Sequence, residues 1–207
     1  MTAEGVPSES WVERAVERSA AVQRSRVRIA QQVRQMLDAA RTLIGAKGDE
    51  FTTQELAAEA GVALQTFYRY FGSKDELLLA VFGDAMTEAC GRWTQAAAEL
   101  SDPLARLRYY ITSTLERLQG DTHDAAMAKF VVSTRWRLHR QYPRELAEAE
   151  QPFVDLVRAE VNAAVAAGLL DPTDPEWDSW FVSELTRSVY HFYAFVAHEE
   201  DELDLVK

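Results

Sequence analysis

The segment from Thr52 to Phe71 has the pattern of two short helices joined by a tight turn. Thr52 and Glu55 form a capping-box pair, which predicts a helix over residues 53–60. Gly61 permits the turn, and a second helix is expected over residues 64–70. The packing faces are supplied by Leu56, Ala57, Ala60, Val62, Phe67 and Phe71. Helix-turn-helix motifs are built in this way, with the first helix supporting a second one whose exposed N-terminal side chains enter the DNA major groove.

An ordinary helical hairpin has the same apolar pattern, so the distribution of charge is relevant. The net charge is −11, but residues 1–75 hold ten basic and ten acidic residues, and residues 76–207 carry the whole excess. Five arginines occur between residues 18 and 37 without an acidic residue: Arg18, Arg24, Arg26, Arg28 and Arg34. A basic arm beside an acidic body can orient a protein on a polyanion. A solvated helix face explains the same arginines equally well.

Residue types that catalyse reactions or bind metals show no matching spacing. The sequence has no phosphate-binding glycine loop, nucleophile elbow or zinc helix signature. Paired metal-ligand spacing is also missing among the histidines, which are His123, His139, His191 and His198. Cys90, between an alanine and a glycine in a helical stretch, is expected to be a packing residue. The sequence therefore predicts no catalytic residue, no metal site and no cofactor.

Helical periodicity continues through almost the whole chain, and no segment has the alternation typical of strands. Apolar residues three and four apart predict a helix over residues 24–45, ended by Gly45 and Gly48. Ser73 and Glu76 form a second capping-box pair, in which the carboxylate is expected to accept from the N–H of Ser73. The predicted fold class is therefore all-α.

The remaining helix boundaries follow from capping residues. Asp102 and Asp174 each precede a proline and are expected to cap the next helix. Residues 9–22 are compatible with a helix that Ser10 and Glu13 would cap. The later helices are expected over residues 74–100, 103–119, 122–141, 144–167 and 175–198.

The sequence also carries expectations about the compartment. No apolar run approaches the roughly 20 residues that cross a bilayer. The first 20 residues lack the basic start and apolar stretch of a secretory signal. A single cysteine excludes a disulfide within the chain. We therefore expect a cytoplasmic protein without a membrane partner.

Residues 24–82 resemble the DNA-binding domain of the tetracycline-repressor (TetR) family. The motif reads Leu-Ala-x-x-Ala-Gly-Val-x-x-x-Thr-Phe-Tyr-x-Tyr-Phe-x-Ser-Lys-x-x-Leu-Leu at positions 56–78. The resemblance implies a three-helix helix-turn-helix domain at residues 24–82, after an N-terminal extension at residues 1–23. It also implies a larger helical domain for ligand binding and dimerisation at residues 83–207.

The resemblance further implies roles in binding double-stranded operator DNA. Phosphate contacts are implied for Thr53, Tyr68 and Lys74, and Tyr70 is expected to contact either phosphate or the core. Base or groove contacts are implied for Gln54, Leu64, Gln65 and Thr66, with Gln65 suited to adenine. Arg26 and Arg28 are expected at the adjacent backbone or minor groove. Ala63 departs from the family by providing no side-chain cap, at a cost of about 1 kcal/mol, so the operator sequence cannot be inherited from a relative.

Two apolar stripes in the last helices indicate how the second domain is used. The family pairs these helices with their symmetry mates, which implies a homodimer interface containing Phe153, Val157, Val161, Trp180, Phe181, Leu185 and Phe192. Packing of both stripes into one internal core is the alternative. A ligand pocket is expected among the aromatic residues Trp93, Tyr109, Tyr110, Phe130, Trp136, Tyr190 and Tyr193, although each of them also suits a core.

These observations predict a dimeric, ligand-responsive transcription regulator, with repression as the expected outcome. It would bind a palindromic operator and be released by a small effector of unknown identity, mainly apolar or aromatic. The helix from Lys74 onward is expected to transmit the effector signal. The alternative function is a helical protein-interaction module without DNA specificity.

Overall fold

The computed structural model describes residue 11 and residues 18–116, 123–171 and 174–195. Within these residues the chain is all-α, as predicted, and has no strand. It forms eight helices, which are α2 (Ala20–Lys47), α3 (Thr53–Glu59), α4 (Leu64–Tyr70), α5 (Lys74–Ala96), α6 (Pro103–Glu116), α7 (His123–Gln141), α8 (Pro143–Ala166) and α9 (Pro175–Phe195).

Most predicted helices agree with these bounds to within two residues. The first begins four residues earlier than predicted, at Ala20, and α5 ends at Ala96 rather than at residue 100 because residues 97–99 turn toward α6. The predicted ends at residues 119 and 198 and the expected cap at Ser10 and Glu13 lie outside the described residues.

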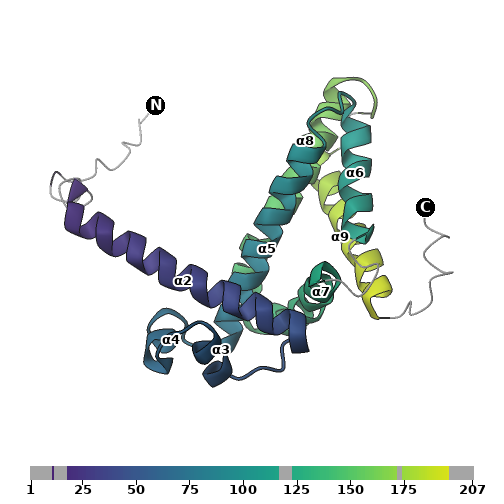
Figure 1. The fold of residues 1–207 in the computed structure, drawn as a ribbon. Helices are drawn as coiled ribbons and strands as arrows, with labels where there is room; N and C mark the ends of the chain where they lie inside the picture. Colours follow the sequence, from purple (N-terminus) through teal and green to yellow (C-terminus); the bar gives the residue numbers. More distant parts are fainter. Residues whose placement is uncertain (1–10, 12–17, 117–122, 172–173, 196–207) are drawn as a thin grey trace.

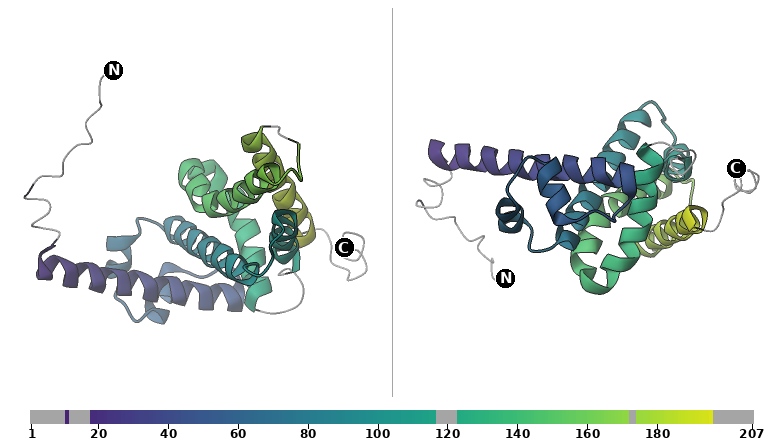
Figure 2. Two further views of the ribbon diagram at one scale, coloured as in Figure 1. Left: turned by 90° about the horizontal axis from the view of Figure 1, so that it is seen from above. Right: turned by 60° about the horizontal axis from the view of Figure 1, so that its bottom comes forward.

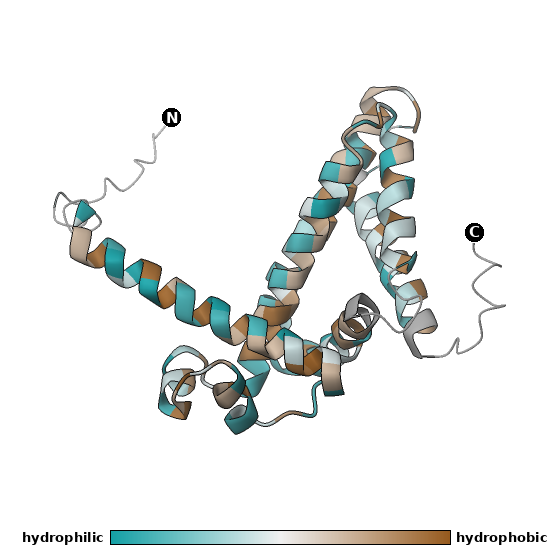
Figure 3. Ribbon diagram, viewed as in Figure 1, coloured by the Kyte–Doolittle hydropathy of each residue, from teal (hydrophilic) through white to brown (hydrophobic). Residues whose placement is uncertain are grey.

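The helices are arranged around α5, which connects the two ends of the molecule. Figure 1 shows α2, α3 and α4 grouped where α5 begins, while α6, α8 and α9 lie along its other end. The C-terminal part of α2 packs against α7. The N-terminal part of α2 projects beyond the other helices in both views of Figure 2. Hydrophilic and hydrophobic residues alternate along this projecting part (Figure 3).

Two clusters of buried apolar residues hold this arrangement together. The first joins α2, α3, α4 and α5, with Leu56, Phe67 and Leu77 fully buried. It also contains Met127 and Phe130 of α7, so the first core extends beyond residue 82. The second joins α5, α6 and α8 around Trp93, Tyr110 and other residues. Each large apolar side chain buried here stabilises the fold by roughly 1.5–3 kcal/mol.

The two predicted capping boxes differ in their geometry. At α3 the box is complete, because Glu55 N donates to Thr52 Oγ1 at 3.1 Å and Thr52 N donates to Glu55 Oε2 at 2.7 Å. At α5 the hydroxyl of Ser73 accepts from Glu76 N at 3.1 Å. The carboxylate of Glu76, however, accepts from Gly72 N at 2.7 Å, so the predicted bond to Ser73 N is wrong.

Residue 72 explains this difference at α5. A Cβ atom at Gly72 would lie 3.0 Å from Glu76 Oε1, so the missing side chain opens the space that the carboxylate occupies. The predicted caps of the later helices are confirmed. Asp102 Oδ1 accepts from Leu104 N at 3.0 Å, and Asp174 Oδ1 accepts from Glu176 N at 3.1 Å.

The complete capping box predicts a pH dependence. Hydrogen bonds from Lys47 Nζ, 2.5 Å from Glu55 Oε1, and from Thr52 lower the pKa of Glu55 from 4.5 to about 2. Because the folded pKa lies below the unfolded one, the ionised carboxylate stabilises the fold above pH 4.5, and this contribution is lost as the pH falls toward 2. Glu55→Gln should therefore flatten the fall in melting temperature over this window, measured by circular dichroism. An unchanged slope would contradict the assignment.

Candidate nucleic-acid interface and ligand cavity

The helix-turn-helix is fixed by burial on one side of α3 and α4. Gly61 takes the left-handed conformation (φ 64°), and Val62 N donates to Ala57 O at 2.9 Å to close the turn. Phe67 is fully buried in the first core and anchors α4. The opposite side of α4 is therefore in solvent, and exposes Gln65 and Tyr68. As expected, Ala63 provides no side-chain hydrogen bond to the start of α4.

The structure brings together several of the predicted DNA ligands. The hydroxyls of Thr53 on α3 and Tyr68 on α4 lie 3.3 Å apart, so the two expected phosphate contacts form one polar site across the turn. Gln54 is exposed on α3, and Thr66 is partly exposed on α4. Leu64 differs from the expectation, because its partly buried side chain packs against the first core instead of standing free.

Two further residues that were predicted to contact DNA have partners inside the protein. Tyr70 Oη donates to Gln32 Oε1 of α2 at 2.6 Å and its ring packs against the first core, so of its two expected roles the structure shows packing. Lys74 Nζ donates to Asp49 O and lies 4.5 Å from the centroid of the Phe51 ring. Burial lowers the pKa of Lys74. The ammonium therefore also fastens the connection between α2 and α3 to the start of α5.

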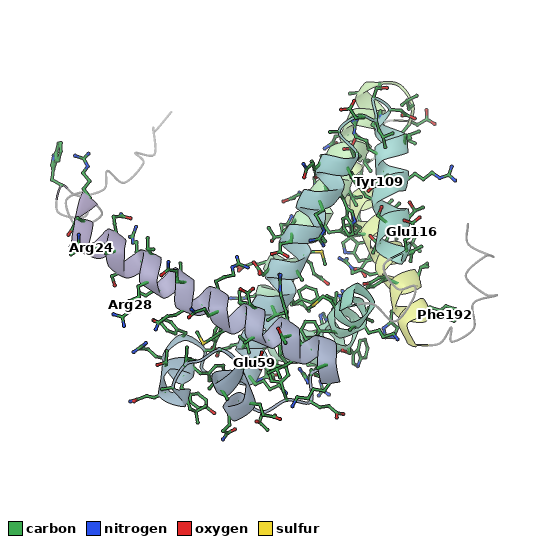
Figure 4. All side chains as sticks on the ribbon, in the orientation of Figure 1. Arg24, Arg28, Glu59, Tyr109, Glu116 and Phe192 are labelled. Carbon is green, nitrogen blue, oxygen red and sulfur yellow. The ribbon has the colours of Figure 1, made fainter. Side chains whose placement is uncertain are left out.

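The arginines of α2 divide into two groups. Arg26 and Arg28 are exposed on the projecting part of the helix, where Figure 4 labels Arg24 and Arg28. Arg34, further along α2, instead binds Asp84 of α5, with Nη1 2.6 Å from Oδ2. The hydrogen bond to Asp84, together with the charge of its carboxylate, raises the pKa of Arg34. Arg34 therefore does not belong to the exposed basic arm that the sequence predicted.

A cavity of about 430 Å³ lies between α5, α7, α8 and α9. Three of the predicted pocket residues line it, namely Trp93, Trp136 and Tyr190. Phe130 does not line it and is buried in the first core. Tyr109 and Tyr110 do not line it either; both pack in the second core, where Tyr110 Oη donates to Glu160 Oε1 at 3.5 Å. The side chain of Tyr193 lies outside the described residues.

Sequence reasoning missed Arg41 and the ion pairs on the cavity wall. Arg41 reaches the cavity from α2 and binds Glu88 of α5 at 2.9 Å. Arg135 of α7 binds Glu150 of α8, with Nε 2.5 Å from Oε1. These contacts join residues 15 and 47 positions apart, which helical periodicity does not relate. The spacing of Arg34 and Arg41, two helical turns apart on one side of α2, was the available signal.

The two predicted interface stripes have opposite environments. Phe153, Val157 and Val161 of α8 are at most 5% exposed and belong to the second core, so their assignment to a dimer interface is wrong. They are buried because α8 packs against α5 and α6. The stripe on α9 is exposed and contains Trp180, Phe181, Leu185 and Phe192. Trp177 adds to it, with its ring centroid 5.8 Å from that of Trp180.

The buried side of α9 is unusual in being small and polar. Ser179 and Ser183 are fully buried and Thr186 is 6% exposed, whereas Leu185 is 64% exposed. An apolar patch of this kind on the surface of a protein marks an interaction site. Thus α9 turns its aromatic side away from its own protomer.

A helix-turn-helix with an exposed polar recognition face, attached to a helical body that encloses a cavity, defines a DNA-binding transcription regulator. Residues 36–81 match the profile described as bacterial regulatory proteins, tetR family. The HTH-type transcriptional regulator BetI of Brucella canis is 31% identical over 149 residues, covering 67% of this chain and 75% of BetI. The chain belongs to the TetR family of transcription regulators.

Solved structures share the fold. FadR of Bacillus subtilis, in complex with stearoyl-CoA, superposes with a TM-score of 0.66 at 19% identity, covering 83% of this chain and 91% of FadR. RolR in complex with resorcinol gives a TM-score of 0.65 at 19% identity, covering 85% of this chain and 84% of RolR.

No helix among the described residues is long and apolar enough to span a membrane.

Proposed function

We propose that this regulator is a cytoplasmic, homodimeric repressor that binds a palindromic operator and is released when a small molecule occupies the cavity. The carrying observation is the polar face of α3 and α4, where Thr53, Gln65 and Tyr68 lie together on a rigidly anchored motif. The proposal divides the chain into a DNA-binding part at residues 24–82 and a ligand-binding and dimerisation part at residues 83–207, with residues 1–23 as an extension.

The first experiment is fluorescence anisotropy with duplexes from the genome of the source organism, beginning with DNA upstream of the coding sequence. Salt concentration is varied, because phosphate contacts make affinity salt-dependent. We expect tight, sequence-specific binding of two protomers to a palindromic site. Failure to bind any duplex specifically, by a folded and ligand-free protein, would favour the protein-interaction alternative.

Within the interface we assign base reading to Gln65, with Gln54 and Thr66 beside it, and phosphate binding to Thr53, Tyr68 and Lys74. Leu64 contributes mainly by packing, because its side chain is partly buried against the core. The exposed Arg26 and Arg28 extend the contact to the adjacent DNA backbone or minor groove. The excess of negative charge in residues 76–207 keeps the rest of the protomer away from the phosphates.

This assignment separates two kinds of variant. Gln65→Ala should change sequence preference at one base pair by about 1–3 kcal/mol. Tyr68→Phe, which removes a single hydroxyl, should weaken binding to all sequences alike, and Lys74→Ala should also lower the salt slope by about one. Anisotropy against a set of single-base operator variants measures both effects. Equal weakening of every sequence by Gln65→Ala would refute its base-reading role.

We assign the dimer interface to the outer side of α9. The supporting observation is its contiguous apolar side chains, Trp177, Trp180, Phe181, Leu185 and Phe192, which lie on the protomer surface. Pairing about a two-fold axis would bury these side chains on both protomers, because each copy contributes the same surface to the interface. It would also place two recognition helices roughly 34–36 Å apart, one turn of DNA.

Leu185→Asp should therefore give a monomer that keeps its helix content, measured by light scattering after size exclusion and by circular dichroism. The cause is an unpaired charge at the centre of an apolar contact. Val157→Ala is the matched control, because Val157 is fully buried in the protomer. It should lower the free energy of unfolding by about 2 kcal/mol without changing the mass of the assembly. A dimeric Leu185→Asp protein would exclude this surface as the interface.

We propose two routes from the cavity to the DNA-binding helices. One is α5, which begins at Lys74 and lines the cavity between Phe82 and Trp93. The other is α7, where Arg135 and Trp136 line the cavity and Arg137 forms an ion pair with Asp49 of the α2–α3 connection. Arg137 Nη1 lies 2.6 Å from Asp49 Oδ2, and Nη2 lies 3.4 Å from Asp75 Oδ1.

Arg137 thereby contacts Asp49, whose carbonyl oxygen accepts from Lys74, and Asp75, the residue after Lys74 in sequence. If Arg137 positions Lys74 in this way, Arg137→Met should weaken operator binding roughly threefold to tenfold, and this loss should vanish in a Lys74→Ala background. The readout is a double-mutant cycle in anisotropy, with Arg140→Met, also exposed on α7, as the control. Additive losses would show that Arg137 does not act through Lys74.

A further inference from the structure

The charged residues around the cavity have an excess of positive charge. Its wall contains four arginines and three glutamates, although the residues after position 75 carry a large negative excess. The arginines are Arg41, Arg92, Arg135 and Arg187, and the glutamates are Glu88, Glu150 and Glu184. Arg41 also binds Asp84, outside the wall, at 2.8 Å, so the guanidinium groups that can favour a negative charge inside the cavity are mainly those of Arg92 and Arg187.

Every carboxylate of the wall already has arginine partners. Glu150 lies 2.5 Å from Arg135 and 3.7 Å from Arg187. Glu184 bonds to Arg187 and lies 4.0 Å from Arg135. Glu88 accepts from Arg41 at 2.9 Å. Each carboxylate that could bind a cationic ligand on this wall is therefore already neutralised by an arginine.

Hydrogen-bonding groups that lack partners on the wall are donors. The Nε atoms of Arg41 and Arg187 are buried without an acceptor. The nearest carboxylate oxygen to Arg92 is that of Glu88 at 3.9 Å, beyond hydrogen-bond distance, and the side chain of Arg92 is 55% exposed. A buried donor without an acceptor is energetically unfavourable. These arginine donors therefore need hydrogen-bond acceptors, and a ligand carboxylate supplies two acceptor oxygens.

The remaining wall is apolar and suits the body of such a ligand. Phe82, Met86, Trp93, Met127 and Phe153 come from three different helices and face one space. Trp93 and Phe153 make an edge-to-face contact, with ring centroids 6.1 Å apart. A volume of about 430 Å³ lies in the range of cavities that bind small molecules.

We propose that the effector is an organic carboxylate with an aromatic or alkyl body, which deepens the proposed function and rests on it. The carboxylate binds Arg187 in place of Glu184 and lies within reach of Arg92. Glu184 is the carboxylate that gives way, because its side chain is 36% exposed and can turn into solvent, whereas that of Glu150 is only 12% exposed. Since Arg187 and Glu184 both belong to α9, this exchange acts on the helix assigned to the dimer interface.

The test compares ligands that differ only in the charged end. Isothermal titration calorimetry and thermal shift are measured on the full chain without DNA. The probes are 4-phenylbutyrate, 4-phenylbutan-1-ol and 4-phenylbutylamine, followed by decanoate, decan-1-ol and decylamine. We expect a carboxylate to bind at least tenfold more tightly than its alcohol and amine, with affinity that falls as salt increases. Preferred binding of an alcohol or an amine, or binding of none of the six, would overturn the proposal.

Variants locate the carboxylate in the cavity. Arg187→Gln should reduce the preference for carboxylate over alcohol at least tenfold, and Arg92→Gln, at a more exposed position that tolerates substitution, should reduce it by a smaller factor. Arg158→Gln is the matched control, because Arg158 of α8 also has a buried Nε atom without an acceptor but does not line the cavity. An unchanged preference in both wall variants would overturn the proposal.

Operator binding is measured separately on the same proteins. Carboxylate binding that leaves the operator affinity unchanged would contradict the release mechanism of the proposed function while supporting the ligand class. Specific operator binding together with no carboxylate preference would overturn the ligand class alone.

Discussion

The first hydrophobic core is the constraint on which the rest of this structure depends, because the DNA-binding helices and the cavity share it. Met127 of α7 belongs to that core and also lines the cavity, while Phe67 of α4 anchors the recognition helix in the same interior. Protein interiors are close-packed, so a shift of α7 at Met127 displaces its neighbours. The proposed boundary between the two functional parts near residue 82 is therefore not a boundary in packing, which continues across it.

Polar contacts repeat this connection at the edge of the core. Arg137 of α7 holds Asp49, whose carbonyl accepts from Lys74, and Arg41 of α2 holds Asp84 and Glu88 of α5. An isolated surface ion pair contributes little to stability. Their value here is geometric, because each joins the DNA-binding part to a helix that lines the cavity. In the proposed release mechanism, these contacts link the state of the cavity to the placement of α3 and α4.

Local structure was predictable from the sequence where it depends on nearby residues. The capping box at Thr52 and the turn at Gly61 need only residues within one or two helical turns, and both were predicted correctly. The stripes on α8 and α9 were not separable, because periodicity identifies an apolar side of a helix but not what covers it. On α8 that side faces its own protomer, whereas on α9 small residues such as Ser183 take the inner side. The cavity required long-range contacts, so aromatic residues alone could not distinguish Trp93 at its wall from Phe130 in the core.

The arginines of α2 show how ion pairing divides one sequence feature between two roles. Arg24 and Arg28 lie on the projecting, solvated part of the helix (Figure 4), where their charge acts outward. Arg34 and Arg41 lie where α2 meets α5, and their charge is spent on Asp84 and Glu88. The negative residues of α5 thus neutralise the inner half of the basic stripe and leave the outer half positive. The helix α2 can then both bind α5 and present positive charge to a polyanion, although the chain as a whole is acidic.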